Sequence, residues 1–244
     1  MKYVNPIKLA EMISNIWIPD KIPVYKFLSR KYFDMFFETG NLRLGTTGDF
    51  ADGIAHGAAR LDREEGRHRT EIRLAEHHYG SGGPDAYLDR VFSGLNDGIA
   101  FKNLNLSMQH TFPDSHVYCA SMYYNEAIFQ RWHTEEGTDT CFEIFDFMGF
   151  LDAITKKLSR DRFFFGAGQI DYIEGAQSYD SKYVDFPSVF VKQAEKFSWQ
   201  VEGRGVWVQR GPYLRITSMV VDVPDARQFC RPFAVLKEGI ITYL

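Results

Sequence analysis

The stretch Val191-Lys192-Gln193-Ala194-Glu195-Lys196-Phe197-Ser198-Trp199-Gln200-Val201-Glu202-Gly203-Arg204-Gly205-Val206-Trp207-Val208 carries the pattern around which the rest of the chain is organised. Residues 197–202 alternate between apolar and polar, which is the period of a half-buried strand, so Gln200 and Glu202 are expected on one face. Gly203 and Gly205 flank Arg204, which predicts a bulge or turn that re-aims the acidic side chain. The simplest alternative is an exposed Glu202–Arg204 ion pair that contributes little stability.

Composition predicts one sheet-centred domain that spans residues 1–244. The chain has 244 residues, of which 45% are hydrophobic and 16% aromatic, so it can bury a sizeable core and favours strands. The formal net charge of -4 provides no basic field, so tight electrostatic binding to nucleic acid is not implied. Three widely spaced cysteines without a CxxC pair argue against a disulfide framework and against a structural zinc site.

Apolar spacing and turn residues predict an α+β order of elements. The expected strands cover residues 23–27, 41–47, 117–124, 140–145, 163–173, 213–221 and 233–236. The expected helices cover residues 5–17, 29–40, 125–132, 150–158 and 186–196, with Ser29 and Asn125 as N-caps and Gly40 as a helix stop. Residues 55–113 are predicted to be a polar insertion, whose mixed charges indicate a solvated helix face.

Neither export nor metal binding is indicated. Polar residues interrupt the N-terminal apolar pattern, and no later run approaches the length of a membrane span. These features and the cysteine usage predict a cytoplasmic protein without membrane association. Glu76, His77 and His78 lack the spacing of a helical metal site such as HExxH, so they are interpreted as surface residues.

Four motifs occur in a fixed order. They are Val24-Tyr25-Lys26-Phe27, then Leu42-Arg43-Leu44 with the acidic turn Asp52-Gly53, then Cys119-Ala120-Ser121 with Trp132, and finally Lys192 with Trp199, Glu202 and Arg204. This order resembles a family of bacterial and phage proteins that is catalogued as a domain of unknown function, over nearly the whole length. The chain departs from that pattern at Ala51-Asp52-Gly53, where the family has Asn-Asp-Pro, and at Gln200, where it has Glu.

The element Gln200-Val201-Glu202 also resembles the Gln/Glu-x-Glu motif of the ADP-ribosyltransferase superfamily, which includes toxins and anti-phage effectors. The resemblance implies a mixed, split central sheet with flanking helices, and NAD as a substrate. It further implies that Glu202 holds the nicotinamide ribose, that Gln200 presents the acceptor, and that Tyr25 in the first strand contacts NAD. The implied partners are a macromolecular acceptor, protein or nucleic acid, and an antitoxin or immunity protein.

The chemistry of NAD cleavage explains why these residue types are suitable. Breaking the bond between ribose and nicotinamide develops positive charge at the anomeric carbon. A carboxylate fixed on a strand, such as Glu202, stabilises that charge by on the order of a few kcal/mol. Gln200 can hydrogen-bond an amide or guanidinium acceptor without ionising. Glu202 and Gln200 are therefore the predicted catalytic residues.

Four other residues are predicted to contact NAD. Ser121, at a strand end, can brace Glu202 or the ribose, although a locally satisfied hydroxyl is the common case. Tyr25 and Trp132 offer flat surfaces for nicotinamide or adenine, and core packing is the alternative for each. Arg204 either meets the pyrophosphate or pairs with Glu202. Lys192 is expected on a solvated helix face.

The function predicted from these residues is transfer of ADP-ribose to a macromolecule. Two alternatives stay open: a NAD glycohydrolase, in which water replaces the acceptor, and a non-catalytic module that binds a nucleotide or a protein. The insertion at residues 55–113 is predicted to recognise the acceptor, because its arginine-rich stretch differs from the apolar periodic segments around it. The arginines concerned are Arg60, Arg63, Arg67 and Arg69. The strands at Tyr25, Ser121 and Glu202 are expected to line one cleft.

Overall fold

A computed structural model of the protein describes residues 22–52, 59–78, 88, 91–92, 99–211 and 216–244, so the helix expected over residues 5–17 lies outside the described residues. The helices are α2 (Arg30–Thr39), α3 (Thr47–Asp52), α5 (Glu126–Glu136), α6 (Phe147–Leu158) and α7 (Ala194–Phe197), with 3-10 turns η1 (Lys182–Val184), η2 (Ser188–Phe190), η3 (Ser198–Gln200) and η4 (Pro224–Phe229). The strands are β1 (Val24–Leu28), β2 (Asn41–Thr46), β3 (Arg67–His78), β4 (Ala100–Thr111), β5 (Ser115–Ser121), β6 (Thr140–Ile144), β7 (Arg162–Gln169), β8 (Asp171–Ile173), β9 (Gln177–Ser178), β10 (Val191–Gln193), β11 (Glu202–Gln209), β12 (Met219–Asp222), β13 (Cys230–Lys237) and β14 (Ile240–Tyr243). The predicted α+β class is confirmed.

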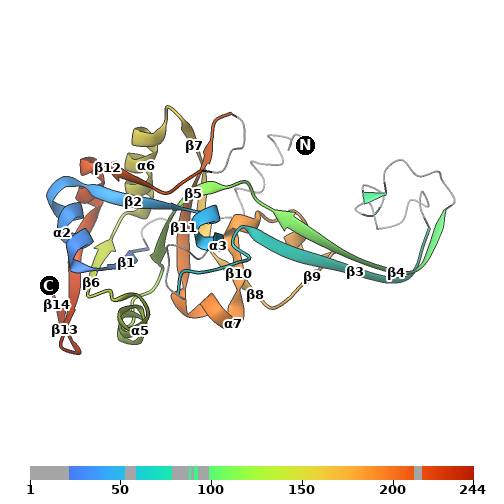
Figure 1. The fold of residues 1–244 in the computed structure, drawn as a ribbon, viewed down its shortest axis with the longest axis horizontal. Helices are drawn as coiled ribbons and strands as arrows, with labels where there is room; N and C mark the ends of the chain where they lie inside the picture. Colours follow the sequence, from blue (N-terminus) through green and yellow to red (C-terminus); the bar gives the residue numbers. More distant parts are fainter. Residues whose placement is uncertain (1–21, 53–58, 79–87, 89–90, 93–98, 212–215) are drawn as a thin grey trace.

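The central sheet has nine strands in the order β12-β2-β5-β1-β6-β13-β14, with β11 paired to β5 and β7 (Figure 1). β11 pairs along the length of β5, whereas the other edge of β5 meets β2 at Val117 and β1 at Ser121. One edge of β5 is therefore shared by two strands. The predicted mixed pairing is wrong for this sheet, because its described pairs are all antiparallel. β1 and β2 run in the same direction, as the crossover helix between them requires, but both lie against β5 and not against each other.

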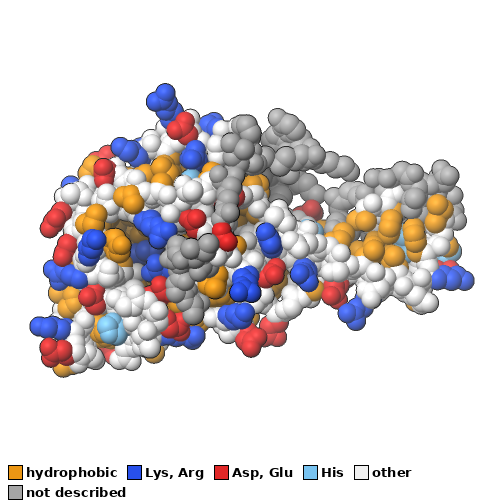
Figure 2. All heavy atoms as spheres, viewed as in Figure 1, with side chains coloured by type: hydrophobic (Ala, Val, Ile, Leu, Met, Phe, Trp, Pro, Cys, Tyr) orange, Lys and Arg blue, Asp and Glu red, His pale blue; other side chains and the backbone are white. Residues whose placement is uncertain are grey.

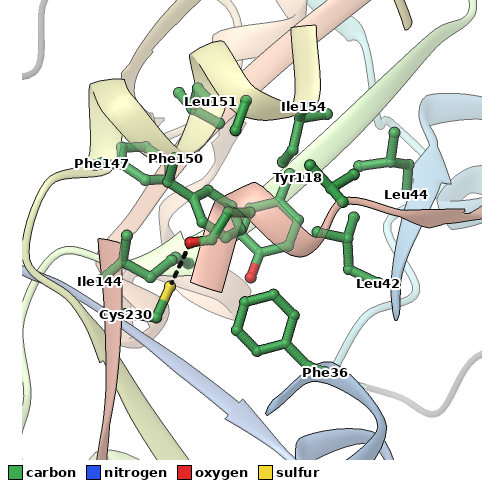
Figure 3. Packing of buried hydrophobic residues seen from close by; sticks show 14 of the residues in the cluster. Phe36, Leu42, Leu44, Tyr118, Ile144, Phe147, Phe150, Leu151, Ile154 and Cys230 are labelled. Carbon is green, nitrogen blue, oxygen red and sulfur yellow. Dashed lines mark hydrogen bonds between the residues drawn. The ribbon is translucent and has the colours of Figure 1, made fainter. Parts of the chain in front are cut away.

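Apolar side chains pack on both faces of the sheet. Helices α2 and α6 contribute to one cluster, with Phe36 from α2 and Phe150 from α6 (Figure 3). In this cluster Phe36 also stacks on Phe142, with ring centroids 5.0 Å apart. Helix α5 contributes to another, in which Phe129 lies 5.3 Å from Phe27. Val24 and Phe27 belong to the same strand but to different clusters, because successive side chains of a strand point to opposite faces. Helix α5 therefore lies on the opposite face from α2 and α6.

Capping residues set the ends of two helices as the sequence indicates. Asn125 accepts a hydrogen bond from the Ala127 backbone N–H over 2.7 Å at the start of α5. Gly40 ends α2 in the left-handed region, with φ 79°, and its N–H donates to Phe36 O. Ser29 occupies the N-cap position of α2 with extended backbone, but its side chain makes no capping hydrogen bond.

The insertion contains a long two-stranded arm and not the predicted helix face. β3 and β4 pair from Arg67–Thr111 to His78–Ala100 and project from the body of the molecule (Figure 1). β9 pairs with β3 in parallel near the root of the arm. In β3 the buried residues His68, Thr70 and Ile72 alternate with exposed arginines, so the segment has the period of a strand. The charged residues lie on the outward face of β3, and their presence between the buried residues made the strand period hard to recognise in the sequence.

The helix predicted over residues 186–196 is also wrong. The segment forms the short turn η2, the strand β10 and the start of α7. Pro187 precedes η2, and β10 pairs in parallel with β8 through Val191 and Asp171. Val189, Phe190 and Val191 are all buried, so the segment is apolar on every side over this length and has no helical stripe. This short strand brings Lys192 to the sheet.

Candidate active site

Three predicted site residues lie side by side on the central sheet. Tyr25 in β1 is the cross-strand partner of Ser121 in β5, and Ser121 is the partner of Glu202 in β11. Directly opposite residues of an antiparallel pair point to the same face. Tyr25, Ser121 and Glu202 therefore share one face of three adjacent strands.

The segment before Glu202 differs from the predicted strand. Helix α7 ends at Phe197, the 3-10 turn η3 follows, and β11 begins only at Glu202. Val201 lies between them in the left-handed region, with φ 44° and ψ 54°, which a β-branched residue rarely adopts. The chain therefore turns sharply one residue before Glu202. The bulge or turn predicted around Gly203 and Gly205 is displaced: both glycines lie inside β11, and the register irregularity of this strand falls between Val206 and Trp207.

A cluster of buried charges surrounds Glu202. Lys192 Nζ donates to Glu202 Oε2 over 2.6 Å, and Arg204 Nε donates to Glu202 Oε1 over 2.8 Å. Arg204 also pairs with Glu65, whose carboxylate lies 3.8 Å from Lys192 Nζ. Asp62 interacts electrostatically with Glu65, Lys192 and Arg204. These five buried residues, Asp62, Glu65, Lys192, Glu202 and Arg204, are called the ion cluster below.

Two expectations about these residues are wrong. Lys192 is predicted on a solvated helix face, but it lies in β10 and is only 7% exposed. The Glu202–Arg204 pair is not exposed either, since Arg204 is 0% and Glu202 4% exposed. Of the two predicted contacts of Arg204, the structure contains the one with Glu202. The Arg204 guanidinium also donates to Val189 O over 2.7 Å, which helps to fix its position.

The cluster holds Glu202 in its ionised form. Burial opposes the charge of this carboxylate, but the attraction of Arg204 and Lys192 outweighs it, so the pKa of Glu202 lies well below its usual value. Burial likewise opposes the charge of Lys192, and the attraction of Glu202 and Glu65 raises its pKa above the usual value. Burial and the nearby Glu65 carboxylate raise the pKa of Asp62 to about 6. Asp62 therefore titrates closer to neutral pH than an ordinary aspartate does.

Gln200 and Ser121 brace the segment before Glu202. The Gln200 amide donates to Ala59 O over 2.6 Å, and its oxygen lies 3.4 Å from Lys192 Nζ. The Ser121 hydroxyl lies 2.7 Å from Gln200 O and 2.9 Å from Tyr123 O, and its single proton can be donated to either. Both residues are buried. The bracing role predicted for Ser121 thus acts through the backbone of Gln200.

Tyr25 and Trp132 pack against the hydrophobic cluster that contains Phe27 and Phe129. The ring of Tyr25 lies 5.0 Å from that of Phe233, and the ring of Trp132 lies 4.9 Å from that of Trp199. The Arg60 guanidinium lies 5.9 Å from the Trp132 ring. In the described part of the chain, the buried Nε1 of Trp132 has no hydrogen-bond partner. A buried donor without a partner is costly, and it marks a place where a ligand or water can bind.

A second unpartnered polar atom lies in the same helix. Glu136 Oε2 pairs with Arg60 Nε over 3.4 Å, whereas the buried Oε1 has no partner among the described residues. Burial raises the pKa of Glu136, and Arg60 opposes that rise. Because Arg60 contacts both Trp132 and Glu136, an unpartnered donor and an unpartnered acceptor lie around one guanidinium.

Sequence reasoning missed three residues that build this region. Asp62 and Glu65 sit in a polar stretch without periodicity, so their burial has no local signal. Tyr172 in β8 accepts a hydrogen bond from the Glu202 backbone N–H over 2.9 Å. Tyr172 falls in the strand predicted over residues 163–173, but the sequence does not reveal which strand its side chain would contact.

Metal binding and membrane spanning find no support in the described residues. No group of three or more His, Cys, Asp and Glu side chains among them could hold a metal ion. None of the helices that the structure describes is long and apolar enough to cross a membrane. Comparison of the chain with protein-family models, with curated proteins and with solved structures finds no match.

Proposed function

We propose that the protein is a NAD-dependent ADP-ribosyltransferase with the fold of that superfamily, acting in the cytoplasm as a toxin or defence effector. The observation that supports this most directly is the register of Tyr25, Ser121 and Glu202 across β1, β5 and β11. The resemblance assigns an NAD contact to the first of these strands and the catalytic carboxylate to the last. The three residues are far apart in the sequence and adjacent on one face of the sheet.

In the proposed reaction the bond between C1' of the nicotinamide ribose and the ring nitrogen breaks, and nicotinamide leaves with the bonding electrons. A nucleophile of the acceptor forms the new bond to C1' and loses its proton to solvent. The Glu202 carboxylate supplies a fixed negative charge beside the carbon that becomes positive. Lys192 and Arg204 keep that carboxylate ionised and in place.

The second support for a nucleotide site is the pair of unpartnered polar atoms at α5. Trp132 Nε1 can donate to a ligand and present its ring for stacking, and the Arg60 guanidinium beside it can meet a phosphate. Arg204, assigned to NAD from the sequence, belongs to the ion cluster, and Gln200, assigned to the acceptor, lies beside it at Lys192; both contribute by positioning Glu202.

The acceptor is proposed to be a macromolecule that the arm contacts. Arg63, Arg67 and Arg69 are exposed, whereas Arg60 lies beside Trp132 and belongs to the nucleotide site. The Arg67→Ala/Arg69→Ala variant should therefore lose labelling of the acceptor and keep NAD hydrolysis, and Arg60→Ala should lose both. Equal loss of labelling and hydrolysis in the arm variant would contradict this division.

One observation favours a second candidate, a non-catalytic module that binds a nucleotide. Both carboxylate oxygens of Glu202 are bonded to cations, and the residue is 4% exposed, so the carboxylate has to be uncovered before it can contact a ribose. A module that only binds the nucleotide needs Trp132 and Arg60 but not Glu202.

Incubation of the purified protein with NAD separates these functions. The transferase releases nicotinamide and passes labelled ADP-ribose to a component of a cell lysate. Nicotinamide release without labelled macromolecule identifies a NAD glycohydrolase, and binding without release identifies the non-catalytic module. An absence of both binding and release would refute the nucleotide site.

A further inference from the structure

The arm has one apolar face and one polar face, and Ile72 on its apolar face is buried. In β4 the partly exposed residues Leu104, Leu106 and Met108 alternate with the exposed residues Asn105, Ser107 and Gln109. The cross-strand partners continue the apolar face, since Leu74 lies opposite Leu104 and Ile72 opposite Leu106. Figure 2 shows hydrophobic side chains gathered on the arm at a distance from the body. A two-stranded hairpin with an apolar face is marginally stable alone in water.

The outer edge of the arm carries almost no charge. Within the described part of the chain, β4 is hydrogen-bonded to β3 alone, so its other edge has no strand partner among those residues. Natural proteins blunt such edges with charged residues or proline. β4 has no proline, and Lys102 is its only Lys, Arg, Asp or Glu residue. β3, which is the inner strand, carries five such residues: Arg67, Arg69, Glu71, Arg73 and Glu76.

We propose that the arm is a homodimerisation element, in which β4 pairs in antiparallel fashion with β4 of a second copy of this chain. Asn103 has φ 52°, and the β3–β4 register skips Ala75 there, so the regular edge runs from Leu104 to His110 with Ser107 at its centre. A two-fold axis at Ser107 places Leu106 opposite Met108 of the second copy, and Asn105 opposite Gln109 of the second copy. In these two pairs an apolar residue meets an apolar residue and an amide meets an amide.

The pattern of β4 favours a second copy over an unrelated polypeptide. A two-fold interface requires a surface that is complementary to itself. The segment Asn105–Gln109 meets this requirement because reversal about Ser107 brings Leu106 to Met108 and Asn105 to Gln109, and neither pair contains a charge; at the margin of the segment Leu104 faces His110. Pairing would extend the two strands of each arm to one four-stranded sheet with a continuous apolar face. This inference is independent of the proposed enzymatic activity.

Cysteine cross-linking tests the register directly. Ser107→Cys places two thiols opposite each other at the axis, so mild oxidation should give a disulfide-linked dimer under denaturing conditions without reductant. Arg69→Cys is the matched control, because residue 69 is also exposed on the arm but lies on the inner strand. Equal cross-linking of the two variants, or none in Ser107→Cys, would overturn the proposed pairing.

Light scattering at increasing protein concentration tests the dimer itself. Wild type should show twice the mass of one chain, and Leu106→Lys should shift it to the mass of one chain, because two like charges would face the centre of the interface. Val220→Lys is the control: Val220 is 60% exposed on β12, an edge strand of the central sheet, and this variant should remain dimeric. A wild type that is monomeric at the highest soluble concentration would refute the proposal. So would a dimer that Leu106→Lys leaves unchanged while circular dichroism shows it folded.

Discussion

The charge balance of the ion cluster predicts that Glu202→Gln lowers the unfolding free energy of the wild type but raises that of the Lys192→Met variant. Above the pKa of Asp62 the cluster holds three carboxylates, those of Asp62, Glu65 and Glu202, against the cations Lys192 and Arg204. Lys192→Met leaves the three carboxylates with Arg204 alone. Removing one partner of a buried ion pair costs about 3–5 kcal/mol, so we expect Lys192→Met to lose that much unfolding free energy.

Glu202→Gln has a different effect in each background. In wild type it removes the acceptor of the charge-assisted hydrogen bonds from Lys192 and Arg204, each worth about 1.5–3 kcal/mol, so it should destabilise. In Lys192→Met it removes an excess buried negative charge, so it should restore about 2–3 kcal/mol. Urea unfolding at pH 7.5, followed by tryptophan fluorescence, measures both effects. Destabilisation of similar size in both backgrounds would refute the charge-balance argument.

The same variants separate catalysis from folding. Lys192→Met is expected to be less stable than the double variant Lys192→Met/Glu202→Gln, but it keeps the Glu202 carboxylate. If the Glu202 carboxylate stabilises the transition state, Lys192→Met should release nicotinamide roughly a hundredfold faster than Lys192→Met/Glu202→Gln, although it is the less stable of the two. If turnover instead follows stability across the series, Glu202 is a structural residue.

Three further substitutions test other parts of the structure. Asp62→Asn should alter the pH dependence of stability, because folding favours the protonated form of Asp62, whose pKa is about 6 in the folded state. The wild type should lose roughly 3 kcal/mol of unfolding free energy as the pH rises from about 4 to 6. The difference in unfolding free energy between the wild type and Asp62→Asn should change by that amount across this window. Trp132→Phe removes the unpartnered Nε1 and should weaken NAD binding by about tenfold without destabilising the fold. Trp199→Phe is the control: it removes a hydrogen bond to Lys196 O and should leave NAD binding unchanged. Calorimetric titration measures the NAD affinity of both variants. Gly40→Ala should lower the unfolding free energy by at least about 2 kcal/mol, because φ is 79° and a Cβ would lie 2.5 Å from the Pro224 backbone. Gly137→Ala, at φ 66° with nothing within 4 Å of the added Cβ, should lower it by about half as much. Similar losses for the two variants in urea unfolding would show that packing against Pro224 is unimportant.

The sequence predicted correctly those helices, strands and caps that are determined by residues close to them in the chain. The strand at Tyr25, the cap at Asn125, the helix stop at Gly40 and the helix α6 are all present. Each depends on residues within a few positions in the sequence, such as an N-cap side chain or a glycine that can adopt positive φ. The proximity of Tyr25, Ser121 and Glu202 was expected from the strand patterns and the short connections between the elements, and the pairing of β1, β5 and β11 brings the three residues together.

The remaining features depend on contacts between distant segments. Residues 197–201 alternate like a strand, yet they form a helical turn and a 3-10 turn, because short runs of apolar and polar residues fit either structure. Lys192 was assigned to solvent because lysine is rarely buried without a partner, and its partners Glu65 and Glu202 come from other elements. The strand β3 was misread since its charged residues occupy only its outward face.

The ion cluster connects the candidate active site to the root of the arm, which limits how loss of activity can be interpreted. Glu65 lies two residues before β3 begins, and its carboxylate pairs with Arg204 beside Glu202. Ala59, in the same connecting segment, accepts a hydrogen bond from Gln200. A substitution at Glu65 therefore perturbs both the carboxylate proposed for catalysis and the position of the arm proposed for dimerisation. Activity lost in such a variant implicates Glu202 only when the variant still dimerises, because an altered arm root would remove the dimer as well.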